Sequence, residues 1–441
     1  MEGTLFVIPF AYPFYPREII DEQVELSKRL LKKLTPAFAD TVFDGHDSKK
    51  ALKMLRAHDP DLVVALLVSW IEAPHVIDTL RDYFGKPLVL WSHTSFQREG
   101  KKQTLGAFVA GGVVKQTLDD FNAPFVFIYG RPGDTGVLLQ IERVYRAAKA
   151  VKRLKSTRIG LIGYPALGMY TGTVDPIAVK KLLGPEIVHI DQYQLIQKSE
   201  AVSESHAKKI TGNIKDLAGL GSNVSEENIS LSSKMYTALK ELVDENQLDA
   251  VTVKCQYELS QIYKYTPCVA LSLLGNEFPS SCEGDLLTIL SQVILYYLTG
   301  EAVTYADIHE VLDERVLVAS CGFAPFSMSE REDRTIARWG WEAFSGVLNS
   351  SPLRKGTVTM ARLSRDRGGF KMHVATGKSV GRSEWNEIGC PPFPGTDIVL
   401  DGNTKAFAKE LVSNHYALVY GDVREELRVM CDFLDVHYIY T

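Results

Sequence analysis

The stretch Asp61–Trp70, DLVVALLVSW, is apolar at almost every position. A strand with one face in water alternates apolar and polar residues, so a continuous apolar run fits a parallel strand covered on both faces. Such a sheet needs helices between its strands, and Arg17–Leu34 and Ala73–Phe84 have the pattern of amphipathic helices. With a strand predicted at Leu5–Phe10, the pattern indicates a doubly wound α/β domain, to which we assign residues 1–155.

A second unit of the same kind begins near Thr157. A strand is predicted at Arg158–Ile162, followed by a turn with glycines, a helix and the strand Glu186–Gln192. The glycines of the turn do not have the G-x-G-x-x-G spacing of a dinucleotide site, so we expect a crossover turn and no organic cofactor. Residues 156–350 form the predicted central α/β domain.

Beyond Ser351 the pattern changes to short, turn-bounded segments of β type. We predict that residues 351–441 form an antiparallel, barrel-like sheet closed by a final αβ piece. The expected fold class is therefore α/β, with two Rossmann-like doubly wound units followed by a β-rich C-terminal domain.

Composition excludes several classes of protein. A hydrophobic content of 45%, a charged content of 23% and a net charge of −5 are typical of a globular protein, and they disfavour a nucleic-acid binder. The apolar start of the chain carries Glu2 and three prolines, which favours a buried strand over a signal peptide. The six cysteines include no C-x-x-C pair, so we expect free thiols, no structural zinc site and a cytoplasmic protein without membrane spans.

The block Leu286–Leu298 is apolar around nearly its whole circumference, which predicts a buried helix that stops at Gly300. Carboxylates flank this helix, with Glu283 before it and Asp307 at the end of the strand that follows. That strand is long enough to return Asp307 to the start of the helix. Two converging carboxylates repel unless a cation or a proton lies between them, so a metal site is one interpretation.

A plainer interpretation uses the same residues. Acidic side chains at a helix N-terminus favour the helix dipole, which alone accounts for Glu283 and Asp285. An aspartate at the end of a strand is an ordinary turn residue, which alone accounts for Asp307.

A family resemblance favours the metal site. Cys282–Asp285 (CEGD) and Leu298–Val311 (LTGEAVTYADIHEV) resemble the active-site region of the L-fucose/L-arabinose isomerase superfamily, and the fucose isomerase branch is the closer match. Cys321–Met328 and Ser413–Leu427 resemble two further segments of that family. The resemblance runs from about Leu248 to the C-terminus and is only architectural before it.

The resemblance implies that Glu283, Asp307 and His415 bind a divalent metal. Two carboxylates and an imidazole suit Mn²⁺ better than a thiolate-preferring ion. Other histidines stay open as alternatives to His415, namely His93, His309 and His373. The implied reaction is aldose–ketose isomerisation of a pentose or hexose through an enediol, with Glu283 and Asp307 as the catalytic acid and base.

Substrate contacts are predicted at four further positions. Trp70 ends a buried strand and could stack on a sugar, although a core tryptophan is the plainer interpretation. Lys254 and Gln256 end another strand, at the edge where ligands gather in open sheets. His309 lies two residues beyond Asp307, on the same face of a regular strand.

Two alternatives remain open for the function. One is an isomerase of an anionic sugar such as a sulfonated hexose, for which Arg98, Lys101 and Lys102 could supply positive charge. The other is a sugar-binding protein that has lost catalysis, against which the intact pair of carboxylates speaks. The resemblance also implies a homo-oligomer, a trimer or a hexamer, with active sites near subunit boundaries.

Overall fold

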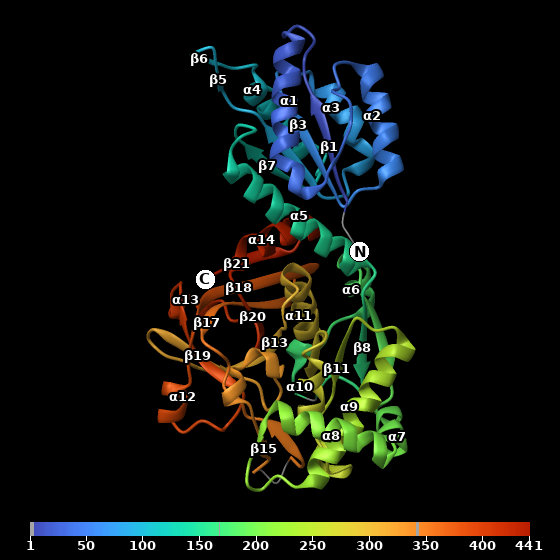
Figure 1. The fold of residues 1–441 in the computed structure, drawn as a ribbon, viewed down its shortest axis with the longest axis vertical. Helices are drawn as coiled ribbons and strands as arrows, with labels where there is room; N and C mark the ends of the chain where they lie inside the picture. The colour runs from blue at the N-terminus through green and yellow to red at the C-terminus, as the bar shows by residue number, and fades with distance from the viewer. Residues whose placement is uncertain (1–3, 167, 341–343) are drawn as a thin grey trace. The chain divides into compact units, whose positions relative to one another are not determined.

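The computed structural model describes residues 4–166, 168–340 and 344–441. The chain divides into two compact units, Met1–Lys152 with Glu425–Leu434, and Arg153–Arg424 with Asp435–Thr441. The residues assigned from sequence to the central and C-terminal domains, 156–350 and 351–441, thus lie largely in the second unit. Figure 1 shows the chain from the blue N-terminus to the red C-terminus.

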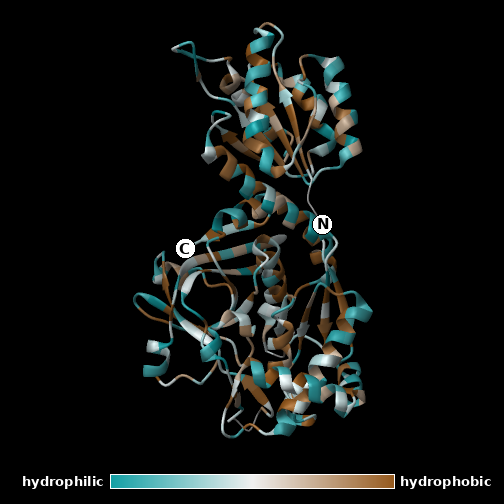
Figure 2. Ribbon diagram, viewed as in Figure 1, coloured by the Kyte–Doolittle hydropathy of each residue, from teal (hydrophilic) through white to brown (hydrophobic). Residues whose placement is uncertain are grey.

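The first unit contains a five-stranded parallel sheet. Its strands lie in the order β2 (Ala37–Phe38), β1 (Leu5–Phe10), β3 (Leu62–Leu67), β4 (Leu88–Ser92) and β7 (Phe125–Tyr129). Every residue of β3 is buried, as predicted for a strand covered on both faces. In Figure 2 the strands of this sheet are brown, and the helices around it carry teal on their outer sides.

Helices and one small hairpin complete the first unit. The hairpin joins β5 (Phe96–Arg98) to β6 (Lys101–Gln103). The helices are α1 (Arg17–Leu31), α2 (Gly45–His58), α3 (Ala73–Leu80), α4 (Ala107–Asp120), α14 (Arg424–Leu434) and α5 (Thr135–Lys155), whose last residues belong to the second unit.

A second parallel sheet lies in the second unit. Its order is β12 (Ser280–Cys282), β11 (Ala250–Val253), β8 (Arg158–Ile162) and β9 (Glu186–Ile190). The helices of this unit are α6 (Pro176–Leu182), α7 (Gln192–Ala201), α8 (Glu204–Leu217), α9 (Glu226–Asn246), α10 (Cys268–Leu274), α11 (Leu286–Thr299), α12 (Ser383–Glu387) and α13 (Thr404–Lys409).

A six-stranded antiparallel barrel forms the rest of this unit. The strands follow the order β17 (Gly356–Asp366), β20 (His415–Tyr420), β13 (Thr304–Val311), β14 (Arg315–Ala319), β19 (Gly395–Leu400) and β18 (Gly369–Gly381), and pairing of β17 with β18 closes the barrel. A parallel strand, β21 (His437–Tyr440), extends it beside β18. A small sheet joins β10 (Gly219–Leu220), β15 (Thr335–Arg338) and β16 (Val347–Asn349). The predicted fold class, two parallel α/β units and an antiparallel barrel, is confirmed.

Helix α11 connects the sheet and the barrel. It contacts β11 and β12 of the sheet and β17 and β20 of the barrel, so its apolar circumference is buried as predicted. The Asp285 carboxylate accepts a hydrogen bond from the Thr288 amide at 2.8 Å and caps the helix. At the other end Gly300 has a φ of 72°, the left-handed conformation that ends many helices. Among the described residues, no helix is both long and apolar enough to cross a membrane.

Candidate functional site

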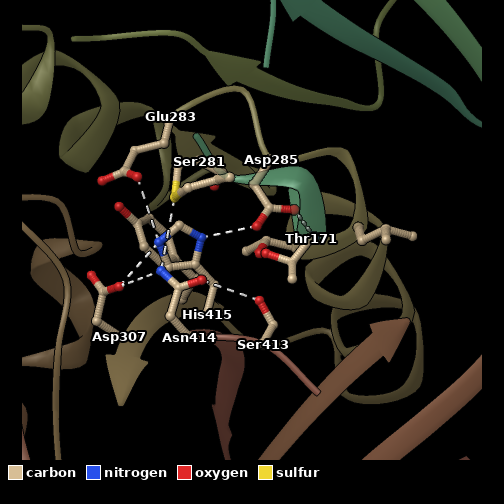
Figure 3. A network of polar contacts seen from close by, with 12 residues as sticks. Thr171, Ser281, Glu283, Asp285, Asp307, Ser413, Asn414 and His415 are labelled. Atoms are coloured by element: carbon tan, nitrogen blue, oxygen red, sulfur yellow. Dashed lines mark hydrogen bonds and ion pairs between the residues drawn. The ribbon is translucent and has the colours of Figure 1, made fainter. Parts of the chain in front are cut away.

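Three predicted metal ligands, Glu283, Asp307 and His415, come from three elements that meet at the start of α11. Asp307 on β13 and His415 on β20 are direct partners in the barrel ladder, which places them side by side. Glu283 follows β12 and begins the turn into α11 (Figure 3). Strand pairing and helix packing thus bring together residues from distant parts of the chain, since Glu283 and His415 are 415 − 283 = 132 positions apart.

The turn that carries Glu283 has an unusual backbone. Glu283 and Gly284 both have left-handed φ angles, 68° and 66°. A side chain on Gly284 would meet the carbonyl oxygen of Tyr164 at 2.5 Å, so only glycine fits there. The Ala166 amide donates to the Glu283 carbonyl at 2.9 Å and ties the turn to the loop after β8. A non-glycine residue in the left-handed conformation is strained, and such residues are found preferentially at functional sites.

The imidazole of His415 lies between the two carboxylates. Its Nε2 is 3.1 Å from Asp307 Oδ1 and 3.6 Å from Glu283 Oε2. His415 and Glu283 are buried, and Asp307 is partly exposed. Nε2 is a buried atom without a hydrogen-bond partner of good geometry among the described residues. A buried nitrogen in this position needs a proton or a cation to interact with.

Asp285 holds the other side of the histidine ring. Its Oδ2 is 2.9 Å from His415 Nδ1, and the Arg362 guanidinium donates to the same oxygen at 2.9 Å. A carboxylate beside Nδ1 holds a proton on that nitrogen, which leaves Nε2 as the nitrogen that can bind a metal. This arrangement is common for metal-binding histidines. Asp285 therefore both caps the helix, as the sequence suggested, and orients the His415 ring.

The pKa values of Asp285 and His415 are shifted in opposite directions. Burial alone would raise the pKa of Asp285, but Arg362 and His415 outweigh it and lower that pKa well below its usual value. Burial likewise opposes protonation of His415, yet the carboxylates of Asp307, Asp285 and Glu283 raise its pKa well above its usual value. The ring is thus held in a strongly anionic environment.

The two carboxyl groups that face Nε2 differ in the direction of their pKa shifts. Burial raises the pKa of Glu283 well above its usual value, and nearby Cys321 and Asp307 add to the rise. For Asp307, contact with His415 outweighs the burial penalty, and its pKa is lowered. Asn414 supports the ionised form because its side-chain amide donates to Asp307 Oδ1 at 2.9 Å. The pKa values of the two neighbouring carboxyl groups are thus shifted in opposite directions.

These residues fit a divalent metal. For bonds of about 2.2 Å, between those of Mg²⁺ and Ca²⁺, neighbouring octahedral ligands lie about 3.1 Å apart. The distances from Nε2 to the two carboxylates, 3.1 and 3.6 Å, are close to that spacing. Two carboxylates and one imidazole nitrogen, which gives up any proton when a metal binds, form a donor set that suits Mn²⁺.

Lys254 and Gln256 lie at the same sheet edge as Glu283. Val253 pairs with Cys282 at the ends of β11 and β12. Lys254 and Glu283 directly follow these two neighbouring strands. The Lys254 ammonium is fully buried, lies 3.0 Å from the Tyr164 hydroxyl, and forms an ion pair with Glu258. Burial lowers the pKa of Lys254. The Gln256 side-chain oxygen is buried and without a hydrogen-bond partner among the described residues.

The remaining predicted contacts lie in different surroundings. His309 occupies a β-bulge of β13, where the register shifts between Ile308 and Glu310. Its ring packs edge-on against Trp385 with centroids 4.7 Å apart, and burial lowers its pKa. Trp70 belongs to the first unit and packs against that unit's core.

The alternative histidines are accounted for by other contacts. His373 contacts Tyr416 and Thr441 through its two ring nitrogens, at 2.6 and 2.9 Å. His93 lies in the first unit and bonds Ser27 at 3.0 Å. Asp285, Arg362, Asn414 and Cys321 are the site residues that the sequence predictions missed. The quoted motifs contain three of these four, namely Asp285 in CEGD, Cys321 in Cys321–Met328 and Asn414 in Ser413–Leu427, so only Arg362 had no signal in them.

Comparison with known proteins bears on the chemistry of this site. No family model matches the chain. The sulfoquinovose isomerase of Priestia aryabhattai is 24% identical over 387 residues and covers 85% of this chain and 84% of its own, and that of Priestia megaterium gives the same values. The sulfoquinovose isomerase of Alkalicoccus urumqiensis is 23% identical over 439 residues and covers 96% of both chains.

A solved structure offers only a weak likeness. A solute-binding protein of an ABC transporter from Agrobacterium vitis is 10% identical, and the match covers 68% of this chain and 90% of that one with a TM-score of 0.17. That score is too low to indicate a shared fold. The sequence relatives are more informative, because their similarity extends over both units. The chain is a distant homologue of sulfoquinovose isomerases, which are sugar isomerases.

Proposed function

We propose that this protein is a metal-dependent aldose–ketose isomerase whose substrate is a sulfonated hexose. The relatives are sulfoquinovose isomerases, which favours the anionic sugar over a neutral pentose or hexose. The observation that carries the proposal is His415, held through Nδ1 by Asp285 while Nε2 faces Asp307 and Glu283. A protein that only bound sugar would have no need of a paired acid and base beside this nitrogen.

The reaction moves a carbonyl group from C1 to C2 of the sugar. It requires one proton to leave carbon, one to reach the neighbouring carbon, and one to change places between the two oxygens. Asp307, with its lowered pKa, is suited to accept a proton, and Glu283, with its raised pKa, is suited to donate one. After the transfer their roles reverse, as the reversible reaction demands.

Glu283, Asp307 and His415 are the proposed ligands of Mn²⁺. When bound there, Mn²⁺ would act as a Lewis acid that polarises the sugar carbonyl and offsets the negative charge of the enediol. Asp285 and Arg362 position the imidazole, since the carboxylate holds Nδ1 and the guanidinium balances the carboxylate. Asn414 orients Asp307 toward the same point.

Sugar contacts are proposed at Lys254 and Gln256, with weaker roles for His309 and Trp70. Lys254 lies beside Glu283 at the sheet edge, but Glu258 already balances its charge. In the β5–β6 hairpin Arg98 pairs with Glu18 and Glu22, whereas Lys101 and Lys102 are exposed. These two lysines are therefore the solvent-exposed basic residues of the predicted cluster. In the expected trimer or hexamer, with active sites near subunit boundaries, they would be candidates to contact an anionic substrate.

A panel of sugars tests the proposal. The full-length protein is treated with chelator, then assayed for ketose formation from sulfoquinovose, glucose, fucose and arabinose, with and without added Mn²⁺. We expect turnover of the sulfonated sugar that depends on the metal and greatly exceeds turnover of the neutral sugars. Equal activity on the neutral sugars would contradict the substrate class. Tight sugar binding with no ketose from any of the four would favour the binding protein instead.

A further inference from the structure

Two cysteine thiols, those of Cys282 and Cys321, lie close to the Glu283 carboxyl group. Cys282 ends β12 directly before Glu283, and Cys321 follows β14 of the barrel. Their sulfur atoms lie 4.0 Å apart, and the Cys321 thiol donates to Glu283 Oε1 at 3.1 Å. One donor atom from each of Cys282, Glu283 and Cys321 lies within 4.8 Å of the others.

This arrangement differs from the site around His415 in its chemistry. The oxygen of Glu283 that faces His415 is Oε2, whereas the oxygen that faces Cys321 is Oε1. The hydroxyl of Tyr305 lies 2.8 Å from Cys282 Sγ and 3.6 Å from Cys321 Sγ, so it contacts both sulfur atoms. The mechanism proposed above uses neither thiol as a ligand.

We propose that Cys282, Cys321 and Glu283 form a second metal site, which takes one thiophilic divalent cation such as Zn²⁺ or Cd²⁺. In a tetrahedral zinc site, bonds to sulfur of about 2.3 Å place two sulfur ligands about 3.8 Å apart. The 4.0 Å between the two sulfur atoms is near that value. Two thiolates and one carboxylate select borderline and soft cations over Mn²⁺.

The site also meets the other requirements for binding. Each thiol releases its proton to solvent when the cation binds, and so does the Glu283 carboxyl when it is protonated. Three protein ligands leave one tetrahedral position for water. Cys321 is partly exposed, which gives the cation a path to the buried Cys282 and Glu283.

Glu283 is shared by both sites, and a consequence follows that rests on the proposed function. A cation held by the two sulfur atoms coordinates Glu283 and removes it from proton transfer. Thiophilic ions therefore inhibit the isomerase through the thiols, even when Mn²⁺ is in excess.

A cadmium titration tests the site without any assay of activity. The metal-free, reduced full-length protein is titrated with Cd²⁺ while the ultraviolet thiolate-to-cadmium charge-transfer band is recorded. We expect the band to saturate at one ion per chain and to be lost in Cys282→Ser and in Cys321→Ser. A wild-type protein without the band, or a band that survives both substitutions, would overturn the site.

Matched controls separate this site from other cysteines and from the His415 centre. Cys255 neighbours Cys282 but lies outside the three-residue group, and Cys390 is a partly exposed thiol elsewhere in the barrel unit. Cys255→Ser, Cys390→Ser and Asp307→Asn should keep the band. Its loss in Cys255→Ser or Asp307→Asn would contradict the ligand assignment. Circular dichroism shows that each variant is folded, and Cys282→Ala serves if Cys282→Ser is not.

The activity arm distinguishes failure of the site from failure of the proposed function. With Mn²⁺ in excess, each variant is compared with its own activity in the absence of Cd²⁺. We expect Cys321→Ser to need at least about tenfold more Cd²⁺ than wild type for half inhibition, as is typical when a metal-site residue is lost. Equal sensitivity would overturn the role of the thiols in inhibition. A band without any isomerase activity would contradict the proposed function and leave the metal site supported.

Discussion

Each unit of this protein buries a histidine beside a parallel sheet, and the two histidines have opposite properties. His93 follows β4 of the first unit, and burial alone lowers its pKa to about 3. His415 is as deeply buried, yet three carboxylates raise its pKa. The Nδ1 of His93 has no hydrogen-bond partner among the described residues, whereas Asp285 holds the Nδ1 of His415.

The difference shows what turns a buried histidine into a candidate site. Burial disfavours the charged ring in both units, so an uncharged His93 fills a polar gap beside Ser27. Carboxylates on both ring nitrogens reverse the effect for His415 and create a place for a cation. Four predictions test this comparison.

The largest effect is expected from the carboxylates that face His415 Nε2. Glu283→Gln and Asp307→Asn keep side-chain volume but remove a proton-transfer group, so kcat should fall about 10²–10⁴-fold. Folding should survive, because glutamine and asparagine keep the size and one oxygen of the side chains they replace. Steady-state kinetics with sulfoquinovose and Mn²⁺ would measure the loss. An Asp307→Asn enzyme with near wild-type turnover would rule out the proposed mechanism.

The next effect concerns the support of the ring. Asp285→Asn leaves the Arg362 guanidinium buried without its counter-charge, and we expect a loss of about 3–5 kcal/mol in the free energy of unfolding. Metal affinity should fall about 10–100-fold, since the carboxylate no longer orients His415. Denaturant titration and isothermal titration calorimetry with Mn²⁺ would measure the two losses.

A double variant sharpens this prediction. In Asp285→Asn with Arg362→Met the unpaired charge is gone, so much of the stability should return while the metal affinity stays low. If affinity returned together with stability, the carboxylate would act only through folding and the comparison with His93 would lose its force.

A pH effect is predicted for His93. Its folded-state pKa of about 3 lies below the usual 6.5 of the unfolded chain, so both states are neutral above pH 6.5. As the pH falls below 6.5, only the unfolded state takes up the proton. The free energy of unfolding of the first unit should then fall by about 1.4 kcal/mol per pH unit from this group.

The variant His93→Gln should remove that part of the acid sensitivity. Denaturation midpoints are compared at pH 7 and pH 5 for the wild type and the variant, with hydrogen exchange of β4 as a report on the first unit. An unchanged pH dependence in His93→Gln would show that burial of this ring has no such effect.

The smallest effect separates capping from site chemistry. Ser225 caps α9 at an exposed position and accepts a hydrogen bond from the Asn228 amide, as Asp285 caps α11 at a buried one. Ser225→Ala should cost about 1 kcal/mol of stability, the usual value for a lost cap. Activity should stay at the wild-type level in enzyme assays below the unfolding temperature. A large loss of activity would mean that capping alone explains the effect of Asp285→Asn.

Local chemistry along the chain determined much of this protein. Continuous apolar runs predicted β1 and β3, and an all-round apolar block with a following glycine predicted α11, because burial and backbone preference act within a few residues. The length of α11 and its return strand also brought Glu283 and Asp307 together in the sequence prediction. The roles of these two residues and of His415 as metal ligands stay predictions.

Only the tertiary structure decided how the site is supported. Asp285 and Arg362 are 77 positions apart, and no periodicity in the chain pairs them. Their contact exists because β17 packs against α11, which no local preference records. The same holds for the Cys321 thiol on Glu283, which depends on where β14 ends. The position of His309 is a further example. A bulge shifts the register of β13 at this residue, where the sequence analysis assumed a regular strand. Secondary structure is a property of neighbours in sequence, whereas the partners of a buried charge are chosen by strands and helices that meet from distant parts of the chain.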